Sequence, residues 1–218
     1  MPRNLSRLIS PKTIAIFGGS WAENVVKQLK KAGYTGQIWP IHPHRQKLLD
    51  LPCFASVAEL PDAPDASFIG VNKQLTVSVV KQLCKRGAGG AVCFASGFLE
   101  SEADVSGGAE LQQQLLQAAG DMPILGPNCY GLLNYLDNIP IWPDEHGGLK
   151  VERGVAIIAQ SSNIAISLTM QQRGDLRRGQ RHHHVVDAQR VADRIGETNR
   201  SRHAVAFRRA LGAKGRKG

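Results

Sequence analysis

Cysteine is scarce in this sequence, and long apolar runs are missing from it. Four cysteines are spread along 218 residues without any Cys-x-x-Cys pair. This spacing argues against a zinc knuckle and against a disulfide framework, and free thiols suit a reducing cytoplasm. No apolar run approaches the roughly 20 residues that a membrane span requires. The N-terminus also has no long hydrophobic signal core, so we expect a cytoplasmic protein that does not enter a membrane.

Acidic residues are few at the C-terminal end. The formal net charge is +9, and residues 175–218 hold twelve Lys and Arg against four acids. The first 174 residues are therefore close to neutral, and their composition gives no reason to expect nucleic acid. The tail leaves a DNA-binding arm open as an alternative, although Phe207 is its only aromatic residue and it contains no recognisable motif.

Short apolar runs alternate with helical patterns along the first 125 residues. The runs are nearly all apolar, which is typical of parallel strands covered on both faces. We therefore predict an α/β fold, a Rossmann-like doubly wound parallel sheet. Ligands bind such sheets at the carboxyl ends of the strands. The predicted strands are 13–17, 38–41, 67–71, 91–94 and 123–125, and the main predicted helices follow Ser20, Gln74 and Glu110.

The chain is predicted to have four parts. A Rossmann-like domain over 1–135 is followed by a Pro- and Gly-containing connection over 136–153. Residues 154–174 carry one strand and one helix, the start of a second flavodoxin-like α/β domain. The basic tail over 175–218 is expected to be disordered or out of frame.

Glycines follow the first predicted strand and precede a helix. Gly18, Gly19 and Ser20 could hold a diphosphate at the helix N-terminus or could form an ordinary strand-to-helix turn. The fingerprint G-x-G-x-x-G is not present, and the loop after the second strand, His42–Arg45, is basic where an NAD site has an acid. This combination favours a phosphorylated adenine nucleotide such as NADP or coenzyme A over NAD.

A second loop, Gly126–Gly131, follows the fifth predicted strand. Proline and glycine fix a tight turn there, which would leave Asn128 and Cys129 over the site. The same residues are compatible with a rigid turn around a buried cysteine.

Six stretches, in their order and spacing, resemble one enzyme family, the NDP-forming acyl-CoA synthetases related to the succinyl-CoA synthetase alpha subunit. They are ISPKTIAIFGGS, IWPIHP, ASFIGV, CFASGF, ILGPNCYGLLN and RGVAIIAQSSN. The resemblance covers about residues 8–174 and implies a coenzyme A-binding domain, followed by flavodoxin-like domains and, in fused members, an ATP-grasp domain. The family reaction interconverts acid, CoA and NTP with acyl-CoA, NDP and phosphate, through an acyl phosphate and a phosphohistidine.

The resemblance also implies roles for individual residues. The glycine loop would face the CoA diphosphate, the next loops would line the pantetheine, and the last loop would lie near the thiol. His42 and Asn72 depart from the family pattern, which has Asn and Pro at these positions. The implied coenzyme A-binding residues are Gly18, Gly19, Ser20, His42, Pro43, Val71, Asn72, Lys73, Ser96, Gly97, Phe98, Asn128 and Cys129.

The turn Gln160-Ser161-Ser162 resembles a Gln-Ser-Gly turn whose helix N-terminus helps to hold the phosphohistidine. Orphan N–H groups and the helix dipole would stabilise a phosphoryl group there. Without the resemblance, an ordinary Ser N-cap is the preferred interpretation.

The sequence departs from the family pattern after Gly174. Its Arg- and His-rich, Lys-poor text is what a GC-rich gene gives out of frame, which resequencing of the locus would check. The run His182–His184 is not expected to bind metal, because neighbours in a row cannot all face one ion and no acidic or cysteine partner lies at ligand spacing. No catalytic residue is assigned.

The expected function is coenzyme A binding without turnover by this chain alone. ATP or ADP would take part only through missing domains, which a separate ATP-grasp (beta-type) chain could carry. The competing interpretation is a non-catalytic Rossmann sensor of NADP or CoA with a basic DNA-binding arm.

Overall fold

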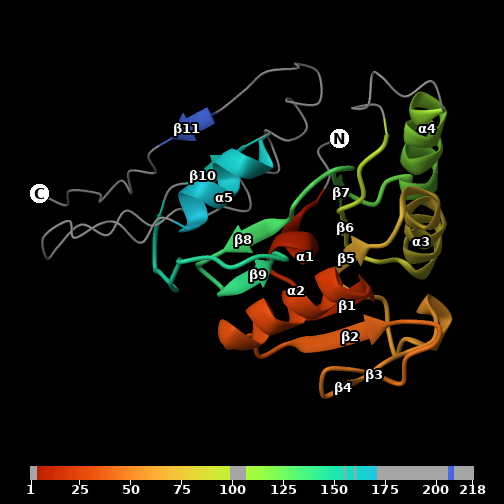
Figure 1. The fold of residues 1–218 in the computed structure, drawn as a ribbon, viewed down its shortest axis with the longest axis horizontal. Coiled ribbons are helices and arrows are strands. Elements are labelled where there is room, and N and C mark those ends of the chain that lie inside the picture. The colour runs from red at the N-terminus through yellow and green to blue at the C-terminus, as the bar shows by residue number, and fades with distance from the viewer. Residues whose placement is uncertain (1–3, 99–106, 155, 160, 171–205, 209–218) are drawn as a thin grey trace, which may run out of the picture.

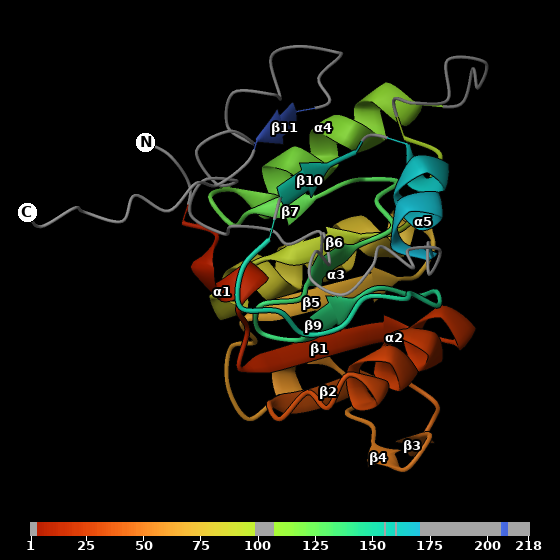
Figure 2. The same ribbon diagram turned by 90° about the vertical axis from the view of Figure 1, so that its left-hand side faces the viewer.

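A five-stranded parallel sheet forms the centre of the protein. The computed structural model describes residues 4–98, 107–154, 156–159, 161–170 and 206–208. The strand order is β2-β1-β5-β6-β7, and Figure 2 shows these strands one above another. Every neighbouring pair is parallel. The strands are β1 (Thr13–Gly18), β2 (Gln37–Ile41), β5 (Ala66–Gly70), β6 (Ala91–Cys93) and β7 (Ile124–Leu125).

Helices cover both faces of this sheet, as Figure 1 shows. One face packs against a short N-terminal helix and the helix after β1, and the other packs against the helices that follow β5 and β6. The predicted α/β, doubly wound fold is therefore confirmed. The helices are α1 (Ser6–Ile9), α2 (Ser20–Lys31), α3 (Lys73–Arg86) and α4 (Gly108–Ala119).

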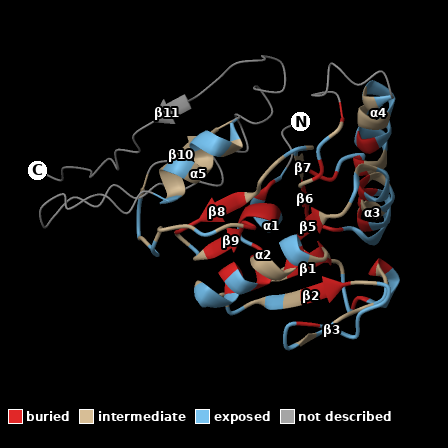
Figure 3. Ribbon diagram, viewed as in Figure 1, coloured by how far each residue is buried: buried red, intermediate tan, exposed pale blue. Residues whose placement is uncertain are grey.

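The inner strand β1 explains why the apolar runs do not alternate with polar residues. Ile14 and Ile16 belong to the core on the α2 side, whereas Ala15 and Phe17 belong to the core on the α3 side. All four are buried, and Figure 3 shows the same pattern across the inner strands. A strand with two buried faces needs apolar side chains at every position.

Pro40 lies in β2, at the edge of the sheet, where it is the register partner of Ile16. An edge strand has one side without a ladder, so the missing N–H of proline is tolerated there. The carbonyl of Pro40 accepts a hydrogen bond from the Phe54 N–H at 2.9 Å. The next segment holds β3 (Lys47–Leu48), β4 (Leu51–Pro52) and the short 3-10 helix η1 (Val57–Glu59).

A β-hairpin follows the sheet and packs on α2. It consists of β8 (Leu132–Asn134) and β9 (Ile139–Ile141). Leu132, Ile139 and Ile141 belong to the same buried cluster as β1. Part of the segment expected to be a connection, 136–153, therefore packs against the α/β core.

The N-terminal helix α1 is tied to the sheet by Arg7. Its Nε lies 2.7 Å from Asp65 Oδ1, and its Nη1 donates to the carbonyl of Gly87 at 2.9 Å. Asp65 Oδ2 also accepts a hydrogen bond from the Lys12 N–H. Burial opposes ionisation of Asp65, but these hydrogen bonds outweigh it and hold the pKa of its carboxyl below the usual value.

Beyond the hairpin the chain forms β10 (Ala156–Ile158) and α5 (Ser162–Met170), and β10 pairs antiparallel with β11 (Ala206–Arg208). The predicted strand and helix after residue 154 are thus present. No residue of α5 is fully buried, and Ile164 is 54% exposed. The remainder of the tail, including His182–His184, lies outside the described residues.

Candidate functional site

The strand order places a topological switch point between β1 and β5. From β1 the chain continues to β2 on one side, whereas β5 lies on the other side. Ligands of open α/β sheets bind in the crevice outside the carboxyl ends of such strands. Gly18 and Gly70 end the two strands and are register partners.

Gly18 allows the two strand ends to approach closely. Its φ is +123°, and a Cβ built on it would lie 2.4 Å from the carbonyl oxygen of Gly70. Both the backbone conformation and the distance exclude a side chain here. The carboxyl edge at the switch point is consequently bare backbone.

The N-terminus of α2 begins directly after this glycine. Gly19 is its N-cap, no side chain caps the helix, and a Cβ on Gly19 would meet nothing within 4 Å. The first N–H groups of a helix have no intrahelical partner and carry the positive end of the helix dipole. Gly18, Gly19 and Ser20 therefore form an open loop at a helix N-terminus, a geometry compatible with an anion.

In the basic loop after β2, a side chain forms hydrogen bonds with the backbone of the same loop. The Nδ1 of His42 accepts hydrogen bonds from the N–H groups of His44 and Arg45, both at 3.2 Å. Desolvation, and then the electrostatic effects of Arg45 and of His44, lower the pKa of His42. Arg45 Nη1 lies 2.7 Å from Glu23 Oε1 in the first turn of α2. The adjacent Pro43 is exposed.

Asn72 caps α3, and Lys73 connects the loops after β5 and β6. The Oδ1 of Asn72 accepts a hydrogen bond from the Leu75 N–H at 2.9 Å, so Asn72 is the N-cap of α3. Lys73 Nζ donates to the carbonyl of Gly97 at 3.1 Å. A helix N-cap explains why asparagine is accommodated where the family pattern has proline.

The other predicted positions in these two loops differ in exposure. Val71 is half-buried and packs against the core on the α3 side. Phe98 is completely buried in the same core, whereas Ser96 is exposed. Of these three, only Ser96 presents an exposed side chain.

The loop after β7 is anchored on the end of β6. The Asn128 N–H donates to the Ala95 carbonyl at 2.9 Å, and the Cys129 N–H donates to the Cys93 carbonyl at 3.2 Å. Asn128 has a φ of +53°, which asparagine tolerates better than most residues. This anchoring brings the predicted Asn128 and Cys129 to the same edge of the sheet as Gly18.

Cys129 is a protonated thiol at neutral pH. Burial raises the pKa of its thiol to about 11, and its Sγ lies 3.8 Å from the carbonyl oxygen of Gly131. Burial similarly raises the pKa of Cys93 to about 12. A thiolate is the nucleophilic form of cysteine, so these residues are suited to packing rather than to attack.

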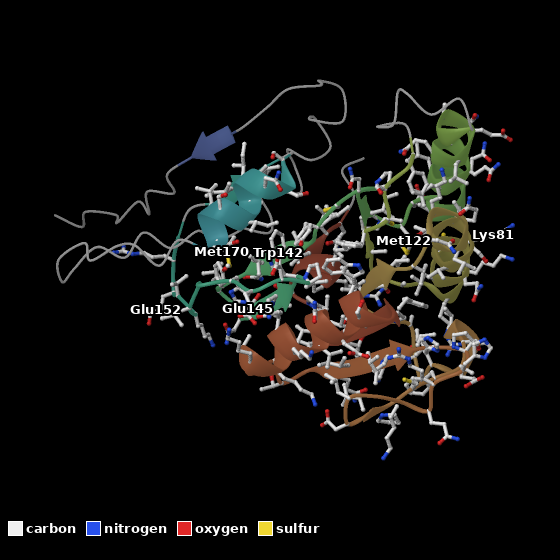
Figure 4. The ribbon with its side chains drawn as sticks, in the orientation of Figure 1. Lys81, Met122, Trp142, Glu145, Glu152 and Met170 are labelled. Atoms are coloured by element: carbon white, nitrogen blue, oxygen red, sulfur yellow. The ribbon has the colours of Figure 1, made fainter. Side chains whose placement is uncertain are left out.

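Sequence reasoning missed a row of aromatic rings along this edge. Trp21, Phe94, Tyr130 and Trp142 follow one another with centroid distances of 5.0, 5.6 and 4.8 Å. The first three lie next to the glycine loop, at the end of β6 and next to Cys129, and Figure 4 labels Trp142 beneath α5. For Trp21, Phe94 and Tyr130, the positions in or after the ends of predicted strands were a signal in the sequence, whereas Trp142 lies in the segment expected to be a connection.

The turn before α5 is capped by its own serine. The Oγ of Ser161 accepts a hydrogen bond from the Ile164 N–H at 3.4 Å, as an ordinary N-cap does. Ser162 is half-buried in the first turn, and Gln160 lies outside the described residues. The geometry of Ser161 is therefore accounted for by capping.

The described residues contain neither a metal-binding cluster nor a membrane-spanning helix. No group of three His, Cys, Asp or Glu there could hold a metal ion. Among the same residues, no helix has the length and apolar character needed to cross a membrane.

Comparisons with known proteins identify the family to which the chain belongs. Residues 12–135 match the family model described as a CoA binding domain. The trans-feruloyl-CoA synthase FCS1 of an unknown prokaryotic organism is 32% identical over 176 residues, 76% of this chain and 24% of that protein. Acetate–CoA ligase [ADP-forming] II of Archaeoglobus fulgidus is 34% identical over 138 residues, 60% of this chain and 20% of that protein.

Solved structures give the same result. The apo form of the dinucleotide-forming acetyl-coenzyme A synthetase 1 of Ca. Korarchaeum cryptofilum superposes with a TM-score of 0.66 at 30% identity, covering 76% of this chain and 36% of that chain. The chain thus spans only about a quarter of the length of the curated relatives described above.

Proposed function

Because the chain belongs to the CoA-binding domain family, in the form found in NDP-forming acyl-CoA synthetases, we propose that it binds coenzyme A along the carboxyl edge of its sheet. The main support for this proposal is the glycine loop, which has no side chains at Gly18 and Gly19 and lies at the switch point between β1 and β5. Backbone N–H groups at a helix N-terminus bind phosphate groups, and the open space over Gly19 admits one.

The other loops at this edge suggest how coenzyme A is oriented along the sheet. We propose that the diphosphate lies on Gly18–Ser20, with Pro43 and His42 at the adenosine side. The pantetheine then passes Val71–Lys73 and the loop Ser96–Phe98. Its thiol would reach Asn128 and Cys129, because that loop is anchored to β6 at the far side of the same edge.

The chain's own part in this site is to bind and to orient. Cys129 stays protonated, so it offers a neutral wall rather than a competing nucleophile beside the coenzyme thiol. The ion pair between Arg45 and Glu23 fixes the loop after β2 against α2. Lys73 ties the two pantetheine loops together through Gly97.

The complete reaction is a larger proposal. We infer that acid, CoA and NTP would be converted to acyl-CoA, NDP and phosphate only when further domains are present, and that this chain alone does not turn over. The matched region is only about a quarter of these relatives, so we assign the remaining steps to domains outside that region, which a separate ATP-grasp chain in the cytoplasm could carry. The helix N-terminus at Gln160–Ser162 would then lie near the phosphorylated histidine.

Calorimetric titration of the full chain tests the binding proposal. CoA should bind one to one, NADP more weakly, and NAD without measurable heat. Gly19→Val fills the open space above the loop and should weaken CoA binding at least tenfold, whereas its unfolding temperature should stay close to that of the unaltered chain. Binding of NADP without binding of CoA would instead favour the nucleotide-sensor alternative, and would refute the proposal.

A further inference from the structure

We propose that Lys73 is a self-acylation site, at which a coenzyme thioester bound by this chain transfers its acyl group to the lysine amine. This inference rests on the proposed coenzyme A site. It concerns a reaction of the bound thioester with the chain itself, whereas the proposed function concerns binding alone.

Lys73 stands at the carboxyl edge of the sheet. It is the first residue of α3, the helix that follows β5, so its backbone lies beside the end of that strand. Its Nζ donates a hydrogen bond to the Gly97 carbonyl at 3.1 Å, in the loop after β6. The half-buried side chain therefore holds its amine at a defined place between two strand ends.

Gly97 makes room for the lysine side chain. Its φ is +89°, and a Cβ built on it would lie 3.2 Å from both the Cδ and the Nζ of Lys73. Glycine adopts this left-handed conformation at no steric cost and carries no Cβ. The lysine side chain can consequently lie directly across the backbone of the loop after β6.

The amine and the proposed thiol position contact the same segment of the chain. The Asn128 N–H, beside which we place the coenzyme thiol, donates to the Ala95 carbonyl at 2.9 Å, two residues before Gly97. Because the strand order places β6 between β5 and β7, Lys73 extends from the β5 end toward the loop after β7. A thioester carbonyl at the thiol end would lie on the side toward which this amine points.

Transfer to the amine needs no further reactant. The neutral Nζ attacks the thioester carbonyl carbon, a C–N bond forms and the C–S bond breaks. The coenzyme sulfur leaves with the bonding electrons and takes up the proton released by nitrogen, which gives an amide on Lys73 and free CoA. Cys129 is a weak competitor, because burial raises the pKa of its thiol to about 11 and keeps it protonated.

Mass spectrometry of the full chain incubated with acetyl-CoA measures this transfer at each lysine. Lys81 is the internal control, because it is exposed on the same helix and lies about 12 Å further along it at 1.5 Å per residue. Figure 4 labels it on the outer side of α3. Lys73 should be acetylated at least about tenfold faster than Lys81, since the bound donor is held beside it. The rate at Lys73 should level off at saturating acetyl-CoA, whereas the rate at Lys81 should stay proportional to its concentration.

Two controls separate transfer within the complex from general lysine reactivity. Excess free CoA should suppress acetylation of Lys73 and leave that of Lys81 unchanged. Acetyl phosphate, which carries no coenzyme, should label the two lysines at similar rates. Lys73→Arg should abolish the fast reaction that CoA suppresses, whereas the matched variant Lys81→Arg should retain it.

The outcomes distinguish this inference from the proposed function. If calorimetry detects no binding of CoA, the coenzyme site is refuted and this inference with it. If CoA binds but Lys73 reacts no faster than Lys81, or if free CoA does not suppress its labelling, the inference alone is refuted. The same holds if acetyl phosphate labels Lys73 just as selectively, or if Cys129 receives the acetyl group in place of Lys73.

Discussion

Replacing Gly18 with alanine should disrupt the contact between β1 and β5. The new methyl group would stand 2.4 Å from the Gly70 carbonyl oxygen, far inside ordinary van der Waals contact. Overpacking costs about 1–3 kcal/mol, and the positive φ of +123° costs a non-glycine residue about 1–3 kcal/mol more. We therefore expect a loss of about 2–6 kcal/mol from a domain whose total stability is of the order of 5–15 kcal/mol.

Thermal and urea unfolding, followed by circular dichroism, measure this loss. At roughly 2–4 °C per kcal/mol for a domain of this size, the unfolding temperature of Gly18→Ala should fall by at least about 4 °C. Gly19→Ala is the matched control, because its methyl group would meet nothing within 4 Å. The control should lose less than about 1 kcal/mol, the difference between glycine and alanine as an N-cap.

Equal unfolding temperatures for Gly18→Ala and the unaltered chain would refute the close approach of the two strand ends. A large loss in Gly19→Ala would contradict the open space over the loop.

Three further predictions concern stability and titration. Asp65→Asn should cost about 1–2 kcal/mol at neutral pH, a value reduced because Arg7 is partly exposed. Folding lowers the pKa of Asp65, so its contribution to the free energy of unfolding is present above about pH 4 and is lost as the pH falls through the folded pKa. The free energy of unfolding of Asp65→Asn should therefore depend less on pH in the acid range than that of the unaltered chain. Asn72→Ala should lose about 1 kcal/mol through the missing cap on Leu75, whereas Asn72→Asp should not. Alkylation of Cys129 should be slow at pH 8 and accelerate toward pH 11; rapid labelling at pH 8 would contradict its raised pKa.

The sheet and its helices were predictable because the signals are local. Ile14–Phe17 is apolar at every position, and this pattern requires a strand covered on both faces. The glycine loop proposed to hold the phosphate was predictable for the same reason, since a strand end, a glycine and a helix start adjoin in the sequence. Pro40 is compatible with the predicted strand, because the strand order places β2 at an edge of the sheet.

Other features depend on contacts between distant segments. The β8–β9 hairpin packs on α2 through Ile139 and Ile141, whose neighbours in the sequence are prolines and turn residues. Trp21 and Tyr130 are separated by more than a hundred residues and approach each other only through the strand order. The hydrogen bond that His42 Nδ1 accepts from its own loop could likewise not be predicted from the sequence, because it depends on the folded backbone.

Amide hydrogen exchange with and without CoA tests the central claim most directly. If coenzyme A lies along the carboxyl edge, it should protect amides at Gly18–Glu23, Val71–Lys73 and Gly126–Gly131. The opposite edge, where Lys12 and Asp65 precede their strands, should exchange as before. Protection confined to that opposite edge, or no protection at saturating CoA, would contradict the account.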